Sequence, residues 1–496
     1  MKQNILIYGI VFLSLSCFLD LSVSWSCFVF ITLAVLLFFQ QRVDDTPLPP
    51  VFLVLLANIL GYPIIVVVPW LYRDLWAHMN PYIIQLTMLW ATRGFAAFCC
   101  AYLLGDAFTR YFHRQSHHDW NDAERLAYIR YIVHAIGILS VIAWLVRIYY
   151  FGLGLTFIDT RTAIDVNSAQ SSISIILNQL VDLRNPFFFL FGIISVRRLY
   201  DRFMWLLFTA IAAELLLEIM VIGSKGTIIL PLIIAALVIT CTTRRMSLKQ
   251  FCASALIGLT VYMSFMVITE YRDIMSDKHR RGEDVFDVSV QTETFTEAFL
   301  ASLPFTEKIK QRRTIVTEEG IFNRISSGIF SFGNLLYFTG GRSPYEHAWQ
   351  SFLIPLYGVV PRAIIEKPLF FNAGRFAQEY FHTTTTAISV STLGSFYHAW
   401  GYGGILAGMA TLGAVFAFFI RRVLFRSAAL NSAVFMVSML IGLVNVGSSF
   451  VGILTDLCRL AVILLGLYML YPIVRRLKSG RAAMALPAAY RAGGGL

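Results

Sequence analysis

The chain alternates long apolar stretches with short polar connections over almost all of its 496 residues. Because the apolar residues are continuous and do not alternate with a period of two, the stretches predict helices rather than strands. A bilayer core of roughly 30 Å needs about 20 apolar residues per helix. The pattern therefore predicts an all-α polytopic membrane protein with about 12 transmembrane helices, near residues 4–20, 23–40, 51–72, 82–104, 129–150, 174–195, 203–222, 226–243, 251–269, 395–419, 429–447 and 454–473.

One connection, between the ninth and tenth spans, is far longer than the others. Its first part, 270–319, is charged and is predicted to be helical. From Ile321 it becomes apolar and aromatic, but Gly and Pro interrupt these segments before they reach a spanning length. They predict interfacial or re-entrant helices packed over the membrane domain. The expected organisation is nine spans in 1–269, the loop in 270–394, three spans in 395–473 and a basic tail in 474–496.

Basic residues mark every second connection, which is the positive-inside pattern of membrane proteins. Both termini are therefore predicted to be cytoplasmic and the long loop periplasmic, in a bacterial inner membrane. The basic connections contain Arg42; Arg110, Arg114 and Arg125; Arg197, Arg198 and Arg202; Arg244, Arg245 and Lys249; Arg421, Arg422 and Arg426; and the tail residues Arg475, Arg476, Lys478, Arg481 and Arg491.

Composition agrees with a membrane location, because 57% of the residues are hydrophobic and only 14% are charged, against about 25% charged in soluble domains. The formal net charge is +11, but residues 270–394 hold 13 Lys and Arg against 14 Asp and Glu, a balance of −1. The remainder then carries +12. This charge orients the spans, so a nucleic-acid partner is not expected.

Neither a metal nor a cofactor is expected. The seven cysteines fall in or beside apolar stretches and none lies in the long loop, which predicts neither a disulfide framework nor a cysteine metal site. A histidine group at His113, His117 and His118 is predicted to belong to a solvated cytoplasmic loop. The first apolar stretch lacks a small-residue cleavage site, so it is predicted to be a retained span.

Ionisable residues at membrane depth are costly, which makes them candidates for function or for structural pairing. Arg184 lies in NQLVDLRNP, where Pro186 is predicted to break the sixth span. A broken helix can present such an arginine to an internal cavity; the alternative is an ion pair with Glu214 or Glu218 on the next span. Another pair is predicted to stabilise the last span, formed by Asp456 and Arg459 at spacing i,i+3.

Cations are expected to gather on the periplasmic side. Lys225 lies in a Gly-Ser-Lys-Gly turn before a helix, a pattern that suits an anion, although a lysine reaching the interface is the alternative. Arginine in apolar surroundings suits bidentate recognition of phosphate oxygens. The other cations on this side are Arg147, Arg161, Arg272, Arg324, Arg342, Arg362, Lys367 and Arg375.

From about the fifth span onward the chain resembles the Wzy-type polysaccharide polymerases, which join O-antigen or other oligosaccharide repeat units and are related to the O-antigen ligases. The resemblance lies in GLGLTFIDTR after the fifth span, GSKG between two spans and YRD after the ninth span. It continues in IPLYGVVPRAIIEKP within the long loop and STLGSFYHAWGYGGILAG at the tenth span.

The resemblance implies a GT-C-like fold and a metal-independent glycosyltransferase that uses a polyprenyl-diphosphate-linked glycan donor. The growing chain passes from one undecaprenyl diphosphate to a new lipid-linked repeat unit at the outer leaflet. The expected partners are these lipid-linked oligosaccharides, the bilayer, and flippase and chain-length regulator proteins. The residues expected to face the diphosphate are Arg161, Lys225, Arg272, Arg324, Arg362 and Lys367, with Arg184 added from its place in the sixth span.

A base within reach of the attacking sugar hydroxyl would assist such a transfer. His398 and Glu379 are the first candidates, because both lie near the junction of the long loop with the tenth span. A satisfied structural histidine is the alternative at His398. Two rival functions remain open, an O-antigen ligase and a lipid-linked oligosaccharide flippase or transporter. Transporters usually contain matching halves, and none are evident here.

Overall fold

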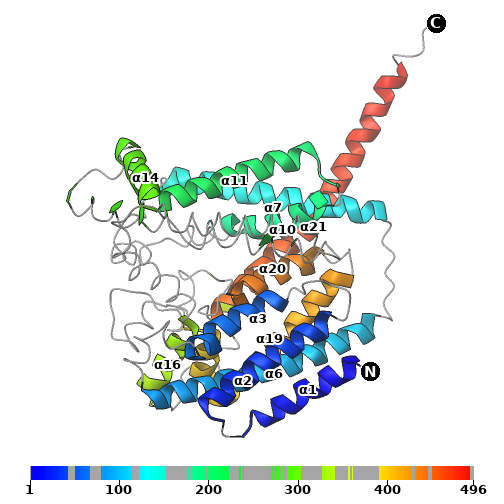
Figure 1. Ribbon diagram of the computed structural model, residues 1–496. Coiled ribbons are helices and arrows are strands. Elements are labelled where there is room, and N and C mark those ends of the chain that lie inside the picture. Colours follow the sequence, from blue (N-terminus) through cyan, green and yellow to red (C-terminus); the bar gives the residue numbers. More distant parts are fainter. Residues whose placement is uncertain are drawn as a thin grey trace.

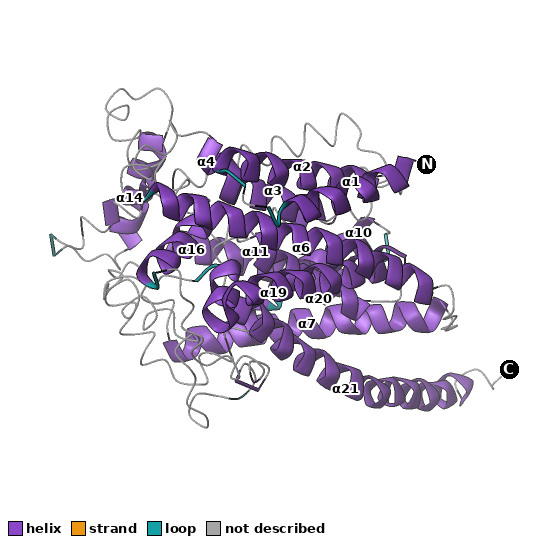
Figure 2. Cartoon of the chain, turned by 90° about the horizontal axis from the view of Figure 1, so that it is seen from below, coloured by secondary structure: helices purple, strands orange, loops and turns teal. Residues whose placement is uncertain are grey.

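The structure is a computed structural model of the chain (Figure 1). It describes residues 2–19, 21–42, 51–67, 80–113, 122–151, 180–196, 198–222, 288–302, 327–340, 390–425, 430–444 and 450–491, together with the separate positions 177, 234, 235, 238, 267, 270, 271, 274, 275, 278, 281, 282, 353, 356, 357 and 360. Throughout these residues the regular structure is helical, without a strand (Figure 2).

The described helices follow one another along the chain with short turns at several of their junctions. Most coincide with an expected span, whereas α14 and α16 belong to the long loop. The elements are α1 (Lys2–Ser16), α2 (Val23–Arg42), α3 (Val51–Ile59), the π-helical turn η1 (Leu60–Ile64), α4 (Ile65–Val67), α6 (Pro81–His113), α7 (Asp122–Phe151), α10 (Arg184–Val196), α11 (Arg202–Ile222), α14 (Val288–Ser302), α16 (Ser327–Phe338), α19 (Thr392–Phe425), α20 (Leu430–Val444) and α21 (Phe450–Arg491).

In the described part of the chain, five helices are long and apolar enough to cross a membrane. This finding supports an α-helical, multi-pass membrane protein, whereas the total of about 12 spans stays a prediction. The expected spans 226–243 and 251–269 lie almost wholly outside the described residues. The five apolar segments are Val23–Gln41, Pro81–Tyr111, Ala127–Tyr149, Thr392–Ile420 and Phe450–Arg475.

Helices α6 and α19 form the most extensive helix pair of the structure. Their backbones meet closely at two glycines. A Cβ atom at Gly105 would lie 2.8 Å from the carbonyl oxygen of Ala414, and one at Gly413 would collide with the carbonyl of Phe98. Small residues of this kind let helices approach within a bilayer, where lipid tails are as apolar as the side chains they would replace.

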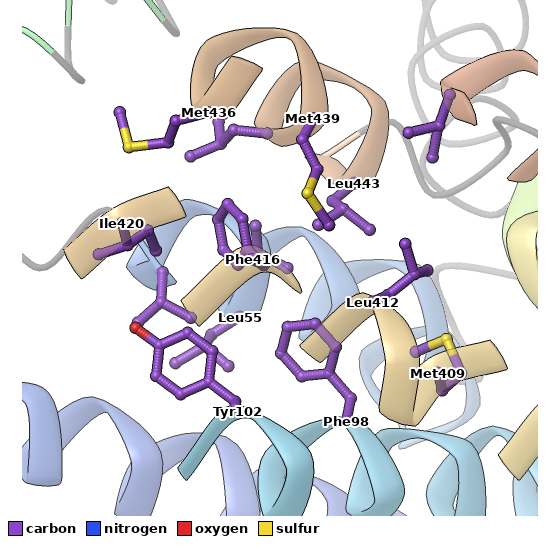
Figure 3. Packing of buried hydrophobic residues seen from close by; sticks show 14 of the residues in the cluster. Leu55, Phe98, Tyr102, Met409, Leu412, Phe416, Ile420, Met436, Met439 and Leu443 are labelled. Atoms are coloured by element: carbon purple, nitrogen blue, oxygen red, sulfur yellow. The ribbon is translucent and has the colours of Figure 1, made fainter. Parts of the chain in front are cut away.

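Aromatic side chains fill the space beside these glycines. Phe98 and Tyr102 of α6 face Phe416 of α19, with ring centroids 6.5 and 6.4 Å from it. Figure 3 shows the two helices meeting over this group, with Met436 and Met439 of α20 closing it from the other side. All five side chains are almost fully buried. Thus α6, α19 and α20 share one core.

Arg93 lies within the fourth expected span and contacts the end of α1. Its Nε donates to the carbonyl oxygen of Cys17 at 2.8 Å, and one of its terminal nitrogens lies 3.3 Å from the carbonyl oxygen of Leu19. Its guanidinium also sits over the ring of Trp90, 4.8 Å from the centroid. Because the last carbonyls of a helix lack intrahelical donors, this partly buried cation caps α1.

The apolar half of the long loop contributes helix α16 to the main core. Ile329, Phe332 and Leu335 are fully buried in the same hydrophobic cluster as α6 and α19. Tyr397 of α19 is hydrogen-bonded to Thr339 just after α16, at 3.3 Å. The sequence predicted packing of this segment on the spans, and the contacts of α16 with α6, α19 and η1 agree with it.

The two ends of the described chain lie away from the loop helices. In Figure 1 both labelled termini are on the right of the view, whereas α14 and α16 are on the left, across the length of the bundle. Helix α14 packs beside the exit of the ninth expected span, where Ala298 meets Tyr271 and Met275. This arrangement agrees with a loop and termini on opposite faces.

We expect Gly413→Ala to destabilise the protein by about 1–3 kcal/mol, because the added methyl group must separate α6 from α19 at a backbone contact. Gly466→Ala is the matched control, since nothing lies within 4 Å of a Cβ at that helical position. The thermal midpoints of the purified variants in detergent measure the difference. Equal midpoints would show that the glycine contact does not hold the helices together.

Candidate functional site

The sixth expected span is interrupted where the sequence predicts a break. Residues 180–182 are helical, Leu183 forms a turn, and α10 starts at Arg184. Pro186 occupies the first turn of α10, where its missing N–H removes no intrahelical hydrogen bond. The Phe187 amide donates to the Leu183 carbonyl at 3.0 Å and so begins the new helix.

A side chain of helix α7 donates a hydrogen bond to a backbone carbonyl beside the break. The hydroxyl of Ser140 donates to the carbonyl of Val181 at 3.1 Å, and Ser140 is fully buried. Inside a bilayer each backbone group needs a partner from the protein, and hydroxyl side chains of neighbouring helices supply it at broken helices. The interruption is therefore a supported feature of the fold.

A polar cavity of about 250 Å³ opens against the break. It lies among three helices that Figure 1 shows meeting near the centre of the bundle, α10, α20 and α21. A mixture of charged, amide, hydroxyl and apolar groups forms its wall. The lining residues are Asp182, Leu183, Asn185 and Pro186 at the break, Ser438 and Ile441 of α20, and Asp456, Arg459, Leu460 and Ile463 of α21.

The ion pair expected in the last span is confirmed and belongs to this cavity. Arg459 Nη1 lies 3.7 Å from Asp456 Oδ1, at the i,i+3 spacing. The side chain of Asp456 is 69% exposed, whereas that of Arg459 is 19% exposed. Both groups also line the cavity.

Arg184 turns to α11 and pairs with Glu214. Its Nη1 lies 3.2 Å from Glu214 Oε1, and the two side chains are 7% and 1% exposed. This is the structural alternative that the sequence left open. Arg184 is absent from the wall of the cavity, although its neighbours Leu183 and Asn185 form part of that wall. The contact of Arg184 with a diphosphate stays a prediction. In this structure the carboxylate of Glu214 already neutralises the charge of Arg184.

Asp201, between α10 and α11, contacts residues of both α11 and α7. Its carboxylate accepts a hydrogen bond of 2.8 Å from the Met204 amide and lies 3.2 Å from His134 Nε2. Partial burial raises the pKa of Asp201, but these hydrogen bonds and the charge of Arg130 outweigh it and lower the pKa below its ordinary value. The ionised carboxylate caps the start of α11, the helix that carries Glu214.

His398 lies in the first turns of α19 and is 2% exposed. It neighbours Tyr397, whose ring is 5.1 Å from that of Tyr402, and Tyr402 in turn stacks on Trp90 of α6 at 4.1 Å. The position at the junction of loop and span is as predicted. Such deep burial is typical of a histidine with a structural role. His398 also does not line the cavity.

The other predicted site residues lie outside the described residues. These assignments therefore stay predictions. They are Glu379, Arg161, Lys225, Arg272, Arg324, Arg362 and Lys367. No group of three or more His, Cys, Asp or Glu side chains that could hold a metal ion occurs among the described residues.

Sequence reasoning missed two features. Arg93 was not singled out, although a cation within an apolar span was the signal to notice. Ser438 and Asn185 were not predicted to share a cavity with Asp456. The polar run NQLVDLRNP predicted the break in the sixth span. The packing of α10 against α20 and α21 is not encoded in any local sequence pattern, so the shared cavity could not be predicted.

We expect Glu214→Gln to destabilise the protein by about 3–5 kcal/mol, because it leaves the Arg184 charge buried without its carboxylate. The double variant Arg184→Met, Glu214→Leu removes both charges and should recover most of the loss. The thermal midpoints of wild type, Glu214→Gln and the double variant in detergent measure the loss of stability and its recovery. A double variant as unstable as Glu214→Gln would contradict a simple charge-pairing role.

Comparisons of this chain with protein-family models, with curated proteins and with solved structures found no match. The likeness to the polysaccharide polymerases therefore rests on the sequence motifs. The structural findings are an α-helical membrane architecture, a loop helix packed into the core of the spans, and a polar cavity at a broken helix.

Proposed function

We propose that this protein is a polysaccharide polymerase that joins undecaprenyl-diphosphate-linked oligosaccharide repeat units at the periplasmic face of the bacterial inner membrane. Both termini would be cytoplasmic and the long loop periplasmic. The reaction would be a metal-independent glycosyl transfer. The product would be O-antigen or an exopolysaccharide.

The packing of α16 is the observation that carries this proposal. Its buried face shares a core with α6 and α19, which keeps this segment of the long loop, residues 327–340, against the spans. An enzyme acting on a lipid-linked sugar has to meet the reacting diphosphate where the bilayer ends. A loop anchored in the core of the spans suits this task better than a free soluble domain would.

The predicted cations supply the electrostatic part of the reaction. Breaking the bond between a sugar and a diphosphate develops negative charge on the leaving phosphate, and preorganised cations sheltered from water stabilise that charge. Arg272 and Arg362 stand in the YRD and PRAIIEKP motifs on which the family resemblance rests. They are the cations proposed to contact the diphosphate.

Two rivals share parts of this description. An O-antigen ligase uses the same donor and passes the glycan to a lipid A-core acceptor. A flippase or transporter moves the lipid-linked unit without breaking its sugar–phosphate bond. The polymerase accounts for the motifs in the long loop, and the three functions leave different glycans on the cell surface.

Deleting the gene should leave surface glycan with at most one repeat unit, because lipid-linked units still cross the membrane but are no longer joined. Electrophoresis of the glycan from the deletion strain and from a complemented strain measures this. A glycan core without any repeat unit would instead indicate a ligase. Repeat units accumulating on the cytoplasmic side would indicate a flippase, and unchanged chain length would overturn the proposal.

Arg272→Ala and Arg362→Ala should each abolish chain elongation, because the leaving diphosphate loses a cation. Arg202→Ala is the matched control, since this arginine starts α11 at the opposite, cytoplasmic side of the proposed topology. Immunoblots of membranes establish equal amounts of each protein, and glycan electrophoresis reports chain length. Normal chains in both loop variants would remove these arginines from the mechanism.

A further inference from the structure

The cavity beside the break of α10 lies toward the loop side of the bundle. Helix α19 starts beside α16, and short connections make α20 and α21 antiparallel to their predecessors. The end of α20 and the start of α21 are therefore on the α16 side. Ser438 lies six residues before the end of α20 and Asp456 six residues after the start of α21. At 1.5 Å per residue, both lie about 9 Å along their helices from the ends on the α16 side.

The charge of the cavity wall excludes two kinds of occupant. Asp182 and Asp456 each bring one negative charge and Arg459 brings one positive charge, which leaves the wall at −1. A diphosphate would be repelled by this balance. A lipid tail offers no hydrogen-bonding group to these charged side chains and would displace water from them, which is unfavourable.

A bound metal ion is also a poor fit. The wall offers two carboxylates, but the described residues contain no group of three side chains able to hold a metal. Hard cations such as Ca²⁺ take six or more oxygen ligands. The guanidinium of Arg459 lies 3.7 Å from Asp456 and competes for the same carboxylate.

The mixture of donors and acceptors matches a polyhydroxyl ligand. A sugar hydroxyl both donates and accepts. The carboxylates of Asp182 and Asp456 accept, Arg459 donates, and the amide of Asn185 and the hydroxyl of Ser438 do both. The remaining wall is apolar, from Pro186, Ile441, Leu460 and Ile463, and can face the C–H groups of a sugar ring.

The cavity is large enough for a small polar ligand. Its volume is about 250 Å³, many times the roughly 10–15 Å³ that a cavity needs to hold one water. The space is therefore sufficient for a ligand with several hydroxyl groups, such as one sugar ring.

We propose that this cavity binds one sugar ring of the acceptor oligosaccharide, with the carboxylates of Asp182 and Asp456 accepting hydrogen bonds from its hydroxyls. This assignment rests on the proposed polymerase function and deepens it. The acceptor sugar would be held at the broken helix, and the donor diphosphate by the cations of the loop. The cavity and the loop cations would thus bind different chemical groups, a sugar ring and a diphosphate.

The test measures binding of the free repeat-unit oligosaccharide, released from the surface glycan of the host strain by mild acid, to the purified full-length protein. Wild type should be stabilised against heat in a saturable way. Asp182→Asn and Asp456→Asn should each weaken binding about tenfold or more, because a hydrogen bond to a charged group is lost. Asp122→Asn is the matched control, since it removes the same charge at the start of α7.

Ser438→Phe provides an independent variant, because it fills the cavity without changing its charge and does not disturb the Asp456–Arg459 pair. It should abolish binding while circular dichroism remains that of wild type. Normal affinity in Ser438→Phe and in Asp456→Asn, or the absence of saturable binding by wild type, would overturn the sugar subsite.

The length of the surface glycan chains in the deletion strain tests the polymerase function separately from the sugar subsite. Long glycan chains without the gene would overturn the polymerase function whatever the binding assay gives. Short chains in the deletion strain, combined with normal binding and normal chain length in the cavity variants, would overturn the subsite alone. Loss of both binding and elongation in these variants, with Asp122→Asn normal, supports both.

Discussion

The close backbone contact between α6 and α19 organises the rest of the structure. In a bilayer, apolar side chains gain little by leaving lipid for protein, so helices associate through tight packing and polar contacts. Gly105 and Gly413 allow this approach. Helix α16 docks on the same two helices, and α20 closes the core from the other side. Helix α16 thus packs on a pair of helices whose close approach requires two glycines.

The charged groups inside the bundle fall into two kinds. Arg93 caps α1 and Arg184 neutralises Glu214, so each has a structural task that accounts for its place in an apolar helix. Asp456 and Arg459 pair with each other but also face a cavity. An ionisable side chain within a membrane protein is a candidate for function by default. The two kinds differ in their surroundings: Arg93 and Arg184 face protein groups, whereas Asp456 and Arg459 also face a cavity.

The broken helix links this cavity to the fold. A continuous sixth span would keep its backbone groups within the helix, whereas the turn at Leu183 lets Asp182 and Asn185 meet α20 and α21. The hydroxyl of Ser140 satisfies the carbonyl of Val181 beside the turn. Discontinuous helices are a common way to build polar sites at membrane depth. In the proposed function, residues at the break would bind a sugar ring, whereas the loop cations would bind a diphosphate.

The sequence by itself determined the helical class, a break of the sixth span close to Pro186, the pairing of Asp456 with Arg459 and the packing of an apolar loop segment. These properties depend on local composition and on spacing along one helix, because an apolar run in lipid has to satisfy its own backbone. Only the tertiary structure decided that Arg184 faces Glu214 and that Asp182, Ser438 and Asp456 share a cavity. Which faces of distant helices meet is set by the fit of whole surfaces, including glycines hundreds of residues apart, and such a fit leaves no periodic signal in the chain.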